Sequence, residues 1–168
     1  GFPEIVEGRV KTLHPKIHAG ILNKRNSKSH LKDLKNNDFE NIDMVIVNFY
    51  PFEKTLKTTK NHNRIIENID VGGPTMVRSA ATNYNDVTVI TSSDHYHEFI
   101  TELNATTGSP TLTFSATMSQ LSFTATASSA PILSNSFHTL STHLFPTTNI
   151  IPLSSLPPLL SVAHPHPH

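Results

Sequence analysis

The distribution of charged residues constrains the fold of this 168-residue chain more than any other feature of its sequence. All 13 Lys and Arg and all 13 Asp and Glu lie within the first 102 residues, and residues 103–168 carry none. The charge-free part holds eight of the twelve prolines and runs such as PLSSLPPLL and AHPHPH. It shows no hydrophobic period of a folded element. We therefore expect a charged, folded part over 1–103, a boundary near 104–109, and an irregular C-terminal part that ends in a disordered Ser/Pro/His-rich tail over 138–168.

The composition excludes several classes of protein and site. The chain has no cysteine, which excludes disulfides and thiolate metal sites. It has no apolar stretch long enough to span a bilayer, and its start lacks the charged-then-apolar pattern of a secretion signal. A net charge of +0 argues against a broad nucleic-acid-binding surface. We therefore expect a soluble, cytoplasmic protein without nucleic-acid or membrane partners.

Two short apolar runs predict the strands of a sheet. The run NIDMVIVNFYPF, residues 41–52, predicts a strand that is buried on both faces, as in parallel sheets. The run NDVTVITSSDHYHEF predicts a second strand at about 87–91. This strand leads into a helix from Ser92 or Ser93 to about Leu103, with a serine as the N-cap.

Helical segments precede and separate these strands. We expect them at about 29–35, 63–70 and 72–84, where Pro74 suits the first turn of the third helix. The alternation of strands and helices predicts an α/β fold, with a parallel sheet that is covered by helices on both faces. Ligands bind beyond the carboxyl ends of the strands in such sheets, and Asn48 lies at one of those ends.

The segment GRVKTLHPKIHAGIL, residues 8–22, gathers cationic side chains around one proline. The Arg9 guanidinium and the Lys11 ammonium suit a phosphate or a carboxylate, but a solvated basic loop has the same composition. His14 and His18 have the spacing of a metal-binding pair on a helix. Pro15 argues against a regular helix there and no acidic ligand is near, so we expect no metal site.

Asn48 and Asp70 are further candidate site residues, each with two interpretations. The Asn48 amide needs hydrogen-bond partners after an apolar run, although Phe49 and Tyr50 beside it can simply be core residues. Asp70 precedes two glycines and a helix start. It either accepts local amide hydrogen bonds or lies beside backbone N–H groups that would favour an anion.

Four motifs in the charged part closely resemble one family when they are taken together. In chain order they are GFPEIVEGRVKTLHPKIHAGIL, IDMVIVNFYPF, IENIDVGGPTMVRSAATN and VTVITSSDHY. They resemble the IMP cyclohydrolase domain of the bifunctional AICAR transformylase/IMP cyclohydrolase family over about residues 1–103. The resemblance implies a methylglyoxal-synthase-like α/β fold that closes the ring of formyl-AICAR, with loss of water, to give IMP. It also implies a purine nucleotide as ligand, a homodimer and no cofactor.

The same resemblance implies the roles of individual residues. Lys11 would supply positive charge beside the reacting formamide, and Tyr50 is similar to the family's pocket tyrosine. The Asp70 carboxylate would orient and polarise the reacting groups. The residues implied to contact the substrate are Arg9, Val10, Lys11, Thr12, Val47, Asn48, Asp70 and Val71.

Three departures from the family imply a truncated and catalytically impaired domain. Thr82 stands where the family motif RAAAKN has its proposed proton-transferring lysine, and a threonine cannot exchange a proton near neutral pH. The chain starts after two family phosphate loops, similar to SDKTG and STGGT, so we expect a sheet that is incomplete at the N-terminus. Residues 104–137 resemble a degenerate remnant of a family helical region, in which Pro131 should interrupt the helix, and no resemblance is seen beyond Phe137.

Two other functions stay open at this point. One is a decayed gene product without catalytic activity. The other is a binding-only, methylglyoxal-synthase-like domain that senses a phosphorylated metabolite.

Overall fold

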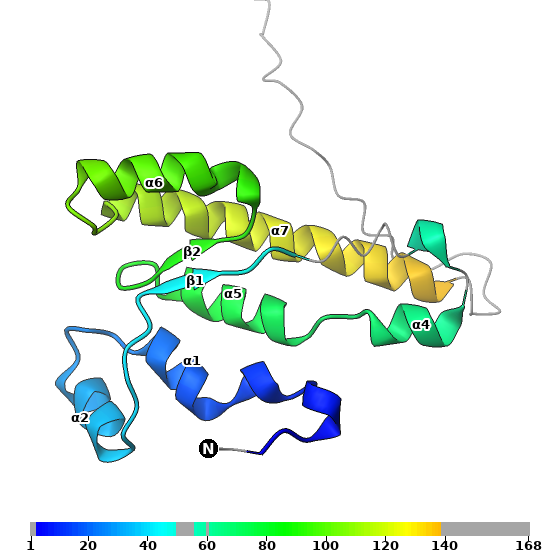
Figure 1. The fold of residues 1–168 in the computed structure, drawn as a ribbon, viewed down its shortest axis with the longest axis horizontal. Helices are drawn as coiled ribbons and strands as arrows, with labels where there is room; N and C mark the ends of the chain where they lie inside the picture. The colour runs from blue at the N-terminus through cyan, green and yellow to red at the C-terminus, as the bar shows by residue number, and fades with distance from the viewer. Residues whose placement is uncertain (1–2, 50–55, 60, 139–168) are drawn as a thin grey trace, which may run out of the picture.

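The computed structural model describes residues 3–49, 56–59 and 61–138 (Figure 1). The 3-10 helices are η1 (Val6–Gly8), η2 (Lys11–Leu13) and η3 (Ser93–His95). The strands are β1 (Met44–Ile46) and β2 (Thr88–Ile90). The α-helices are α1 (Pro15–Leu22), α2 (Lys28–Asn36), α4 (His62–Glu67), α5 (Gly72–Thr82), α6 (Tyr96–Ala105) and α7 (Leu112–His138).

The two strands pair in parallel, with Val45 opposite Val89. Helices lie on both faces of this pair, with α6 and α7 above it and α1 and α5 below it in Figure 1. Side chains of successive strand residues point to opposite faces, so each face has its own core. The predicted parallel sheet with helices on both faces is confirmed.

One core fills the space between the sheet and α1 and α5. Val45 and Val89 from the strands pack there with Ile21 from α1 and with Val77 and Ala80 from α5. All five of these side chains are buried. This core packs the second half of α5 against the sheet.

The other core joins β2 to α6 and α7. Ile90 packs there with Phe99 from α6 and with Phe114 and Met118 from α7. The rings of Phe99 and Phe114 are stacked with their centroids 5.9 Å apart. The second strand is therefore buried on both faces, as a strand of a doubly covered sheet should be.

The prediction that the first strand is also buried on both faces is wrong. Val45 is buried, but Met44 is 37% exposed and Ile46 is 48% exposed. Met44 and Ile46 lie on the same face of the sheet as Ile90. On that face α6 and α7 pack against β2, which leaves these two side chains of β1 partly exposed. The strand is also shorter than expected, and residues 50–52 of the predicted run lie outside the described residues.

Short polar side chains set the starts of the helices. The Ser27 hydroxyl accepts a hydrogen bond from the His30 N–H at the start of α2, and Ser92 does the same for Asp94 at η3. The expectation that Pro15 argues against a regular helix is wrong, because Pro15 is the first residue of α1. The first N–H of a helix has no partner within the helix, so a proline there loses nothing.

The expectation of irregular structure after residue 104 is wrong for 112–138, which form the 27-residue helix α7. Pro131 lies inside this helix and does not interrupt it. Tertiary contacts hold α7 in place: the Ser119 hydroxyl donates to the Ala81 carbonyl at 2.8 Å, and the Thr88 and Ser115 hydroxyls are 2.9 Å apart. Residues 139–168 of the predicted tail lie outside the described residues.

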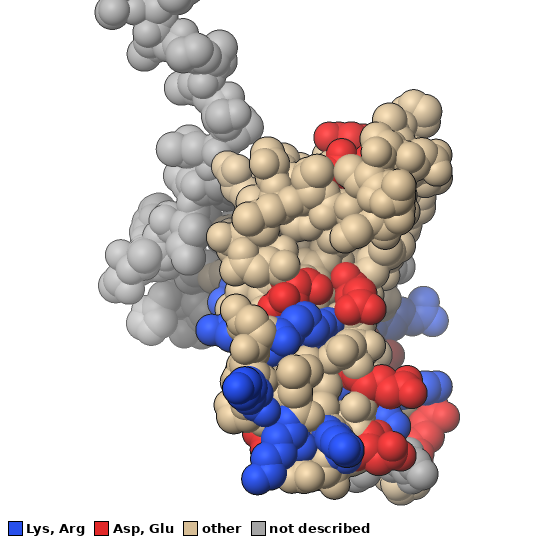
Figure 2. Space-filling view, turned by 90° about the vertical axis from the view of Figure 1, so that its left-hand side faces the viewer, with Lys and Arg blue, Asp and Glu red and all other residues tan. Residues whose placement is uncertain are grey.

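The surface of α7 carries hydroxyl groups and no charged side chains. Several Ser and Thr side chains donate to the backbone carbonyl four residues earlier, among them Thr117 to Thr113 and Ser128 to Thr124. These local bonds satisfy the hydroxyls without any partner outside the helix. Figure 2 shows the result on one face, where Lys and Arg gather below and the part formed by α6 and α7 is nearly free of charge.

Within the described residues, the structure contains no helix with the length and apolar character needed to cross a membrane.

Candidate functional site

The start of α5 is the point at which three separate segments of the chain meet. Gly72 packs directly against Thr12 from η2, and Gly73 packs against Val47 from the end of β1. The Gly73 N–H donates to Asp70 Oδ1 at 3.1 Å, so the carboxylate caps the first turn of the helix. A methyl group at position 73 would overlap Asp70 Oδ2 and would lie 3.2 Å from Val47 Cγ1, so only glycine allows this approach without a shift.

A cavity of about 350 Å³ lies beside this junction. Its walls are the segment around Arg9 and Thr12 on one side and the linker 67–72 between α4 and α5 on the other. Four residues of the predicted set, Arg9, Thr12, Asp70 and Val71, line this one cavity. The structure therefore brings together the first and third of the predicted contact segments.

The charges around this cavity are mixed. The Arg9 guanidinium lies among its walls together with the Glu67 and Asp70 carboxylates. A guanidinium offers a planar fork of donors, and carboxylates accept hydrogen bonds from N–H and O–H groups. The cavity thus suits a ligand that carries both an oxyanion or carbonyl and several N–H or O–H donors.

Lys11 does not line the Arg9 cavity. It lines a neighbouring cavity of about 410 Å³ together with Glu4, His14 and Lys16. Within η2, Lys11 and Thr12 are successive residues and point in different directions, so Thr12 lines the cavity of Arg9 and Lys11 does not. Val10, half-buried at the start of η2, lines neither cavity.

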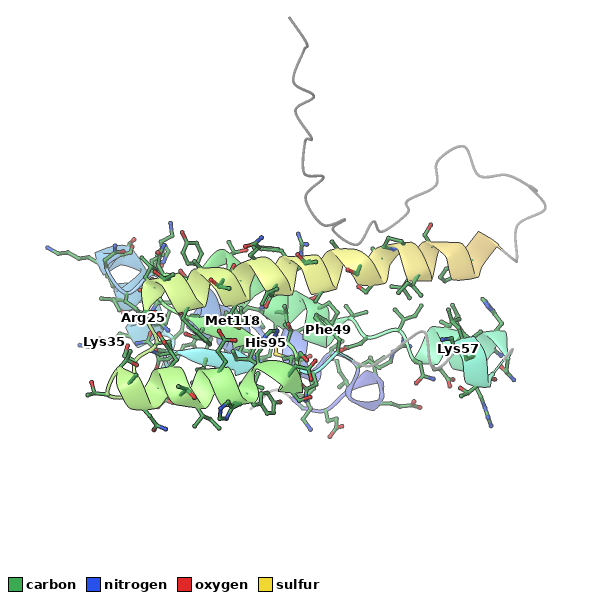
Figure 3. The ribbon with its side chains drawn as sticks, turned by 90° about the horizontal axis from the view of Figure 1, so that it is seen from above. Arg25, Lys35, Phe49, Lys57, His95 and Met118 are labelled. Carbon is green, nitrogen blue, oxygen red and sulfur yellow. The ribbon has the colours of Figure 1, made fainter. Side chains whose placement is uncertain are left out.

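The carboxyl end of β1 carries the second predicted segment. Val47 packs behind Gly73, while Asn48 is exposed and its Oδ1 accepts a hydrogen bond from the Tyr96 hydroxyl at 3.2 Å. Figure 3 shows Phe49 and His95, which follow the two strands, at the same end of the sheet. Tyr50 lies outside the described residues.

Thr82 lies at the opposite end of α5 from this junction. Gly72 and Thr82 are the first and last of the 11 residues of α5, so they lie roughly 15 Å apart along the helix axis. The side chain is exposed, and its hydroxyl donates to the Arg78 carbonyl at 2.8 Å. Thr82 lines neither of the two cavities described above.

His18 holds the site together, a role that the sequence did not predict. Its Nε2 is 3.1 Å from the Thr12 carbonyl oxygen, and its Nδ1 is 3.1 Å from the Ser79 hydroxyl. Since a carbonyl can only accept, Nε2 carries the proton and Nδ1 accepts from Ser79 in the neutral ring. The ring thereby ties η2 to the middle of α5. The spacing from His14 gives no hint of this role, because the partners of His18 are a backbone carbonyl and a distant serine.

His14 has a structural role at the start of α1. Its Nδ1 accepts a hydrogen bond from the Lys16 N–H at 3.0 Å and so caps the helix. In the described part of the chain, no three His, Asp or Glu side chains come together as a metal-binding group.

Comparisons with known proteins identify the domain. Residues 1–75 match the MGS-like domain family. The bifunctional purine biosynthesis protein PurH of Acetivibrio thermocellus is 54% identical over 107 residues, which cover 63% of this chain and 21% of that protein. The PurH protein of Oceanobacillus iheyensis is 38% identical over 167 residues, which cover 99% of this chain and 32% of that protein.

The second alignment reaches beyond Phe137, so the expectation of no resemblance past that residue is wrong. Among solved structures, the crystal structure of ForH matches with a TM-score of 0.70 and 27% identity, over 82% of this chain and 72% of that one. The chain spans about a fifth to a third of the length of the curated relatives it matches. It therefore contains an MGS-like domain and is, across that domain, a homologue of the bifunctional purine biosynthesis proteins PurH.

Proposed function

We propose that this chain is an IMP cyclohydrolase-type domain of purine biosynthesis, which binds formyl-AICAR and closes its ring to IMP with release of water. The observation that carries the proposal is the cavity at the start of α5, where Arg9 and Asp70 line one space. The relatives, which are named as purine biosynthesis proteins, support the same pathway. A cytoplasmic location and a homodimer remain predictions from the resemblance.

The cavity offers the groups that ring closure needs. The carboxamide nitrogen of the substrate attacks the formyl carbon, and negative charge develops on the formyl oxygen. The Arg9 guanidinium is the cation available to stabilise that charge. The Asp70 carboxylate can accept the proton that the attacking nitrogen loses and return a proton to the formyl oxygen. The second proton of the departing water comes from the formamido nitrogen, where the new C=N bond forms.

Fixed geometry would supply a further part of the catalysis. Asp70 is held by its bond to the Gly73 N–H, and Thr12 is held between Gly72 and the His18 ring. A carboxylate that is already oriented loses no freedom when the substrate binds. Val47, behind Gly73, acts in this proposal as packing that fixes the helix start.

We also propose that turnover by this chain is slow. Asp70 must both take the proton of the attacking nitrogen and return one to the departing oxygen, because Arg9 is permanently charged and Thr12 cannot donate a proton near neutral pH. Lys11, the other cation of the segment, lines the neighbouring cavity. A general acid separate from the base typically contributes about a hundredfold to ten-thousandfold to a rate, and the described walls of the cavity offer none besides the carboxylates.

A binding-only function is the second candidate, and the same observation favours it. A cavity that holds a nucleotide but has no general acid besides the carboxylates of its described walls would bind the nucleotide with little or no reaction. The two candidates differ in one measurable property, the formation of IMP from formyl-AICAR.

Isothermal titration with IMP and an absorbance assay of ring closure together test the proposal. We expect Arg9→Ala to weaken IMP binding by about tenfold or more, and Arg64→Ala, on the exposed face of α4, to leave it unchanged. We expect Asp70→Asn to keep the cap on Gly73 and to lower ring closure by about a hundredfold or more. Binding of IMP without detectable ring closure would favour the binding-only function, and no IMP binding by the parent chain would exclude both.

A further inference from the structure

A polar cavity of about 330 Å³ lies at the amino-terminal end of the two strands, and Asn48 marks their other end. The residues around the starts of β1 and β2 form one side of the cavity, and the connection between α6 and α7 forms the other. Figure 1 shows this connection and the one from α5 to β2 at the same end of the molecule. The side chains that give the cavity its chemistry are Asp43, Tyr84, Asp86 and Ser115.

We propose that this cavity is a second binding site, which takes a neutral polyhydroxylated molecule of about the size of a monosaccharide. The inference goes beyond the proposed function, because it concerns a different ligand at the other end of the sheet. The walls of this cavity share no residue with the contact set implied by the sequence or with the cavity at the start of α5.

Two carboxylates give the cavity its hydrogen-bond acceptors. Arg25 holds one oxygen of each: its backbone N–H donates to Asp86 Oδ2 at 3.2 Å, and its guanidinium donates to Asp43 Oδ1 at 3.1 Å. The second oxygen of each carboxylate has no hydrogen-bond partner among the described residues. The cavity therefore presents two positioned acceptors to a ligand that carries O–H or N–H donors.

A buried pair of hydroxyls gives the cavity a donor. Thr88 and Ser115 both line it and are each 5% exposed, and their hydroxyl oxygens are 2.9 Å apart. One hydroxyl of the pair donates to the other, and neither has a further acceptor among the described residues. One buried O–H group is therefore left without an acceptor, which costs free energy unless a bound molecule supplies one.

These groups together select the class of ligand. An anion would meet two carboxylates, and no Lys or Arg is among the described walls. A metal ion or an ammonium group would satisfy the carboxylates but offers no acceptor to the buried O–H group. A hydroxyl group both donates and accepts, so a polyhydroxylated molecule satisfies both. The half-buried Tyr84 ring offers apolar surface to the C–H groups of a sugar.

The wall formed by the α6–α7 connection is fixed by hydrogen bonds to α6. The Gly108 N–H donates to the Leu103 carbonyl at 2.8 Å, and the Thr111 N–H donates to Glu102 Oε1 at 2.8 Å. A methyl group at position 108 would meet no atom within 4 Å, so the space beside this glycine is open. The volume of the cavity lies at the lower end of the range of about 300–1,000 Å³ for small-molecule sites.

Titration of the full chain with D-glucose, followed by NMR of the backbone amides, tests this assignment. We expect a dissociation constant on the order of 1 mM and shifts of the signals of Asn85, Gly108 and Ser109. Spermidine and inorganic phosphate, as cationic and anionic probes, should bind more weakly than glucose. Excess IMP should not displace glucose, because the site proposed for IMP lies at the other end of the sheet.

Two matched pairs of variants locate the binding. Ser115→Ala should weaken glucose binding by about tenfold, and Ser119→Ala should not, because the equally buried Ser119 hydroxyl donates to the Ala81 carbonyl and does not line the cavity. Asp86→Asn should weaken glucose binding by a similar factor, and Asp94→Asn, beyond the other end of β2, should leave it unchanged. The second pair carries the test if Ser115→Ala does not fold by circular dichroism.

Three results would each overturn the assignment. They are no glucose binding by the folded parent, tighter binding of spermidine or phosphate than of glucose, and an unchanged glucose affinity in folded Ser115→Ala and Asp86→Asn. Each of them is independent of whether the chain binds IMP, so the proposed function and this inference are tested separately.

Discussion

Thr12 lies so close to Gly72 that a methyl group at position 72 would overlap the Thr12 hydroxyl. This single contact fixes η2 against the start of α5. It thereby also fixes Arg9 relative to Asp70 across the cavity at the start of α5. Thr12 and Gly72 are sixty residues apart in sequence. The position of each wall of the cavity therefore depends on its contact with the other wall.

Gly72→Ala should therefore destabilise the fold by about 1–3 kcal/mol, since overpacking forces the two segments apart. Removing the hydroxyl should relieve part of the overlap, so the double variant Gly72→Ala with Thr12→Ala should be more stable than Gly72→Ala alone. Urea unfolding of the four chains measures the coupling, which we expect to be about 1 kcal/mol or more. Strict additivity of the two changes would show that Thr12 and Gly72 do not touch in solution.

His18→Ala should loosen η2 without touching the ligand. It removes the partner of the Thr12 carbonyl and of the Ser79 hydroxyl, which should lower stability by about 1–3 kcal/mol. His18→Gln can donate to the Thr12 carbonyl and should recover part of that loss. We also expect His18→Ala to weaken IMP binding, measured by titration, and equal IMP affinity in all three chains would contradict a positioning role.

Thr82→Lys tests whether position 82 belongs to the site. Because Thr82 lies at the far end of α5, lysine there should leave IMP affinity unchanged. It should stabilise the chain by about 0.3–1 kcal/mol, since a cation near a helix C-terminus is favourable. Thr101→Lys in α6 is the control for helix propensity, because its hydroxyl also donates to the carbonyl four residues earlier. Recovery of ring closure by Thr82→Lys alone would contradict the conclusion that position 82 lies away from the cavity.

Glu102 should make the docking of α7 dependent on pH. Its Oε1 accepts a hydrogen bond from the Thr111 N–H at 2.8 Å, just before α7 begins. Hydrogen bonds from the Thr111 side chain and then from its backbone hold the pKa of Glu102 below its ordinary value of 4.5. A lowered pKa in the folded state stabilises the fold above that ordinary value, and the contribution disappears as the pH falls through the lowered pKa.

Thermal unfolding between pH 3 and 7 measures this contribution, which screening keeps small at this exposed position. Glu102→Gln should flatten part of the acid side of the curve. Identical pH profiles for Glu102→Gln and the parent would exclude the carboxylate of Glu102 as a source of acid sensitivity.

Local sequence patterns predicted most of the fold around the site. The helix over 72–84 followed from the Gly-Gly-Pro start, and the parallel pairing followed from strands that alternate with helices. The helix α7 was missed because its sequence lacks charges and contains Pro131. Its stability comes from contacts with α5 and β2, which no periodicity reveals.

Four residues that the sequence named as candidates, Arg9, Thr12, Asp70 and Val71, line one cavity, and their role as a site stays a prediction. The arrangement of the other candidates could not be predicted. The separation of Lys11 from Arg9 depends on the rotation of a short 3-10 turn, and the role of His18 depends on a partner 61 residues away. Both are tertiary properties that a single sequence does not contain.

The most direct test of the central claim is thermal unfolding of the full chain, monitored by circular dichroism, with and without excess IMP. If the cavity at the start of α5 binds a purine nucleotide, IMP at 100 times its dissociation constant should stabilise the fold by about 2.7 kcal/mol and raise the midpoint. The same excess should raise the midpoint of Arg9→Ala much less. A cooperative transition whose midpoint does not respond to IMP would contradict the claim that this cavity is a nucleotide site.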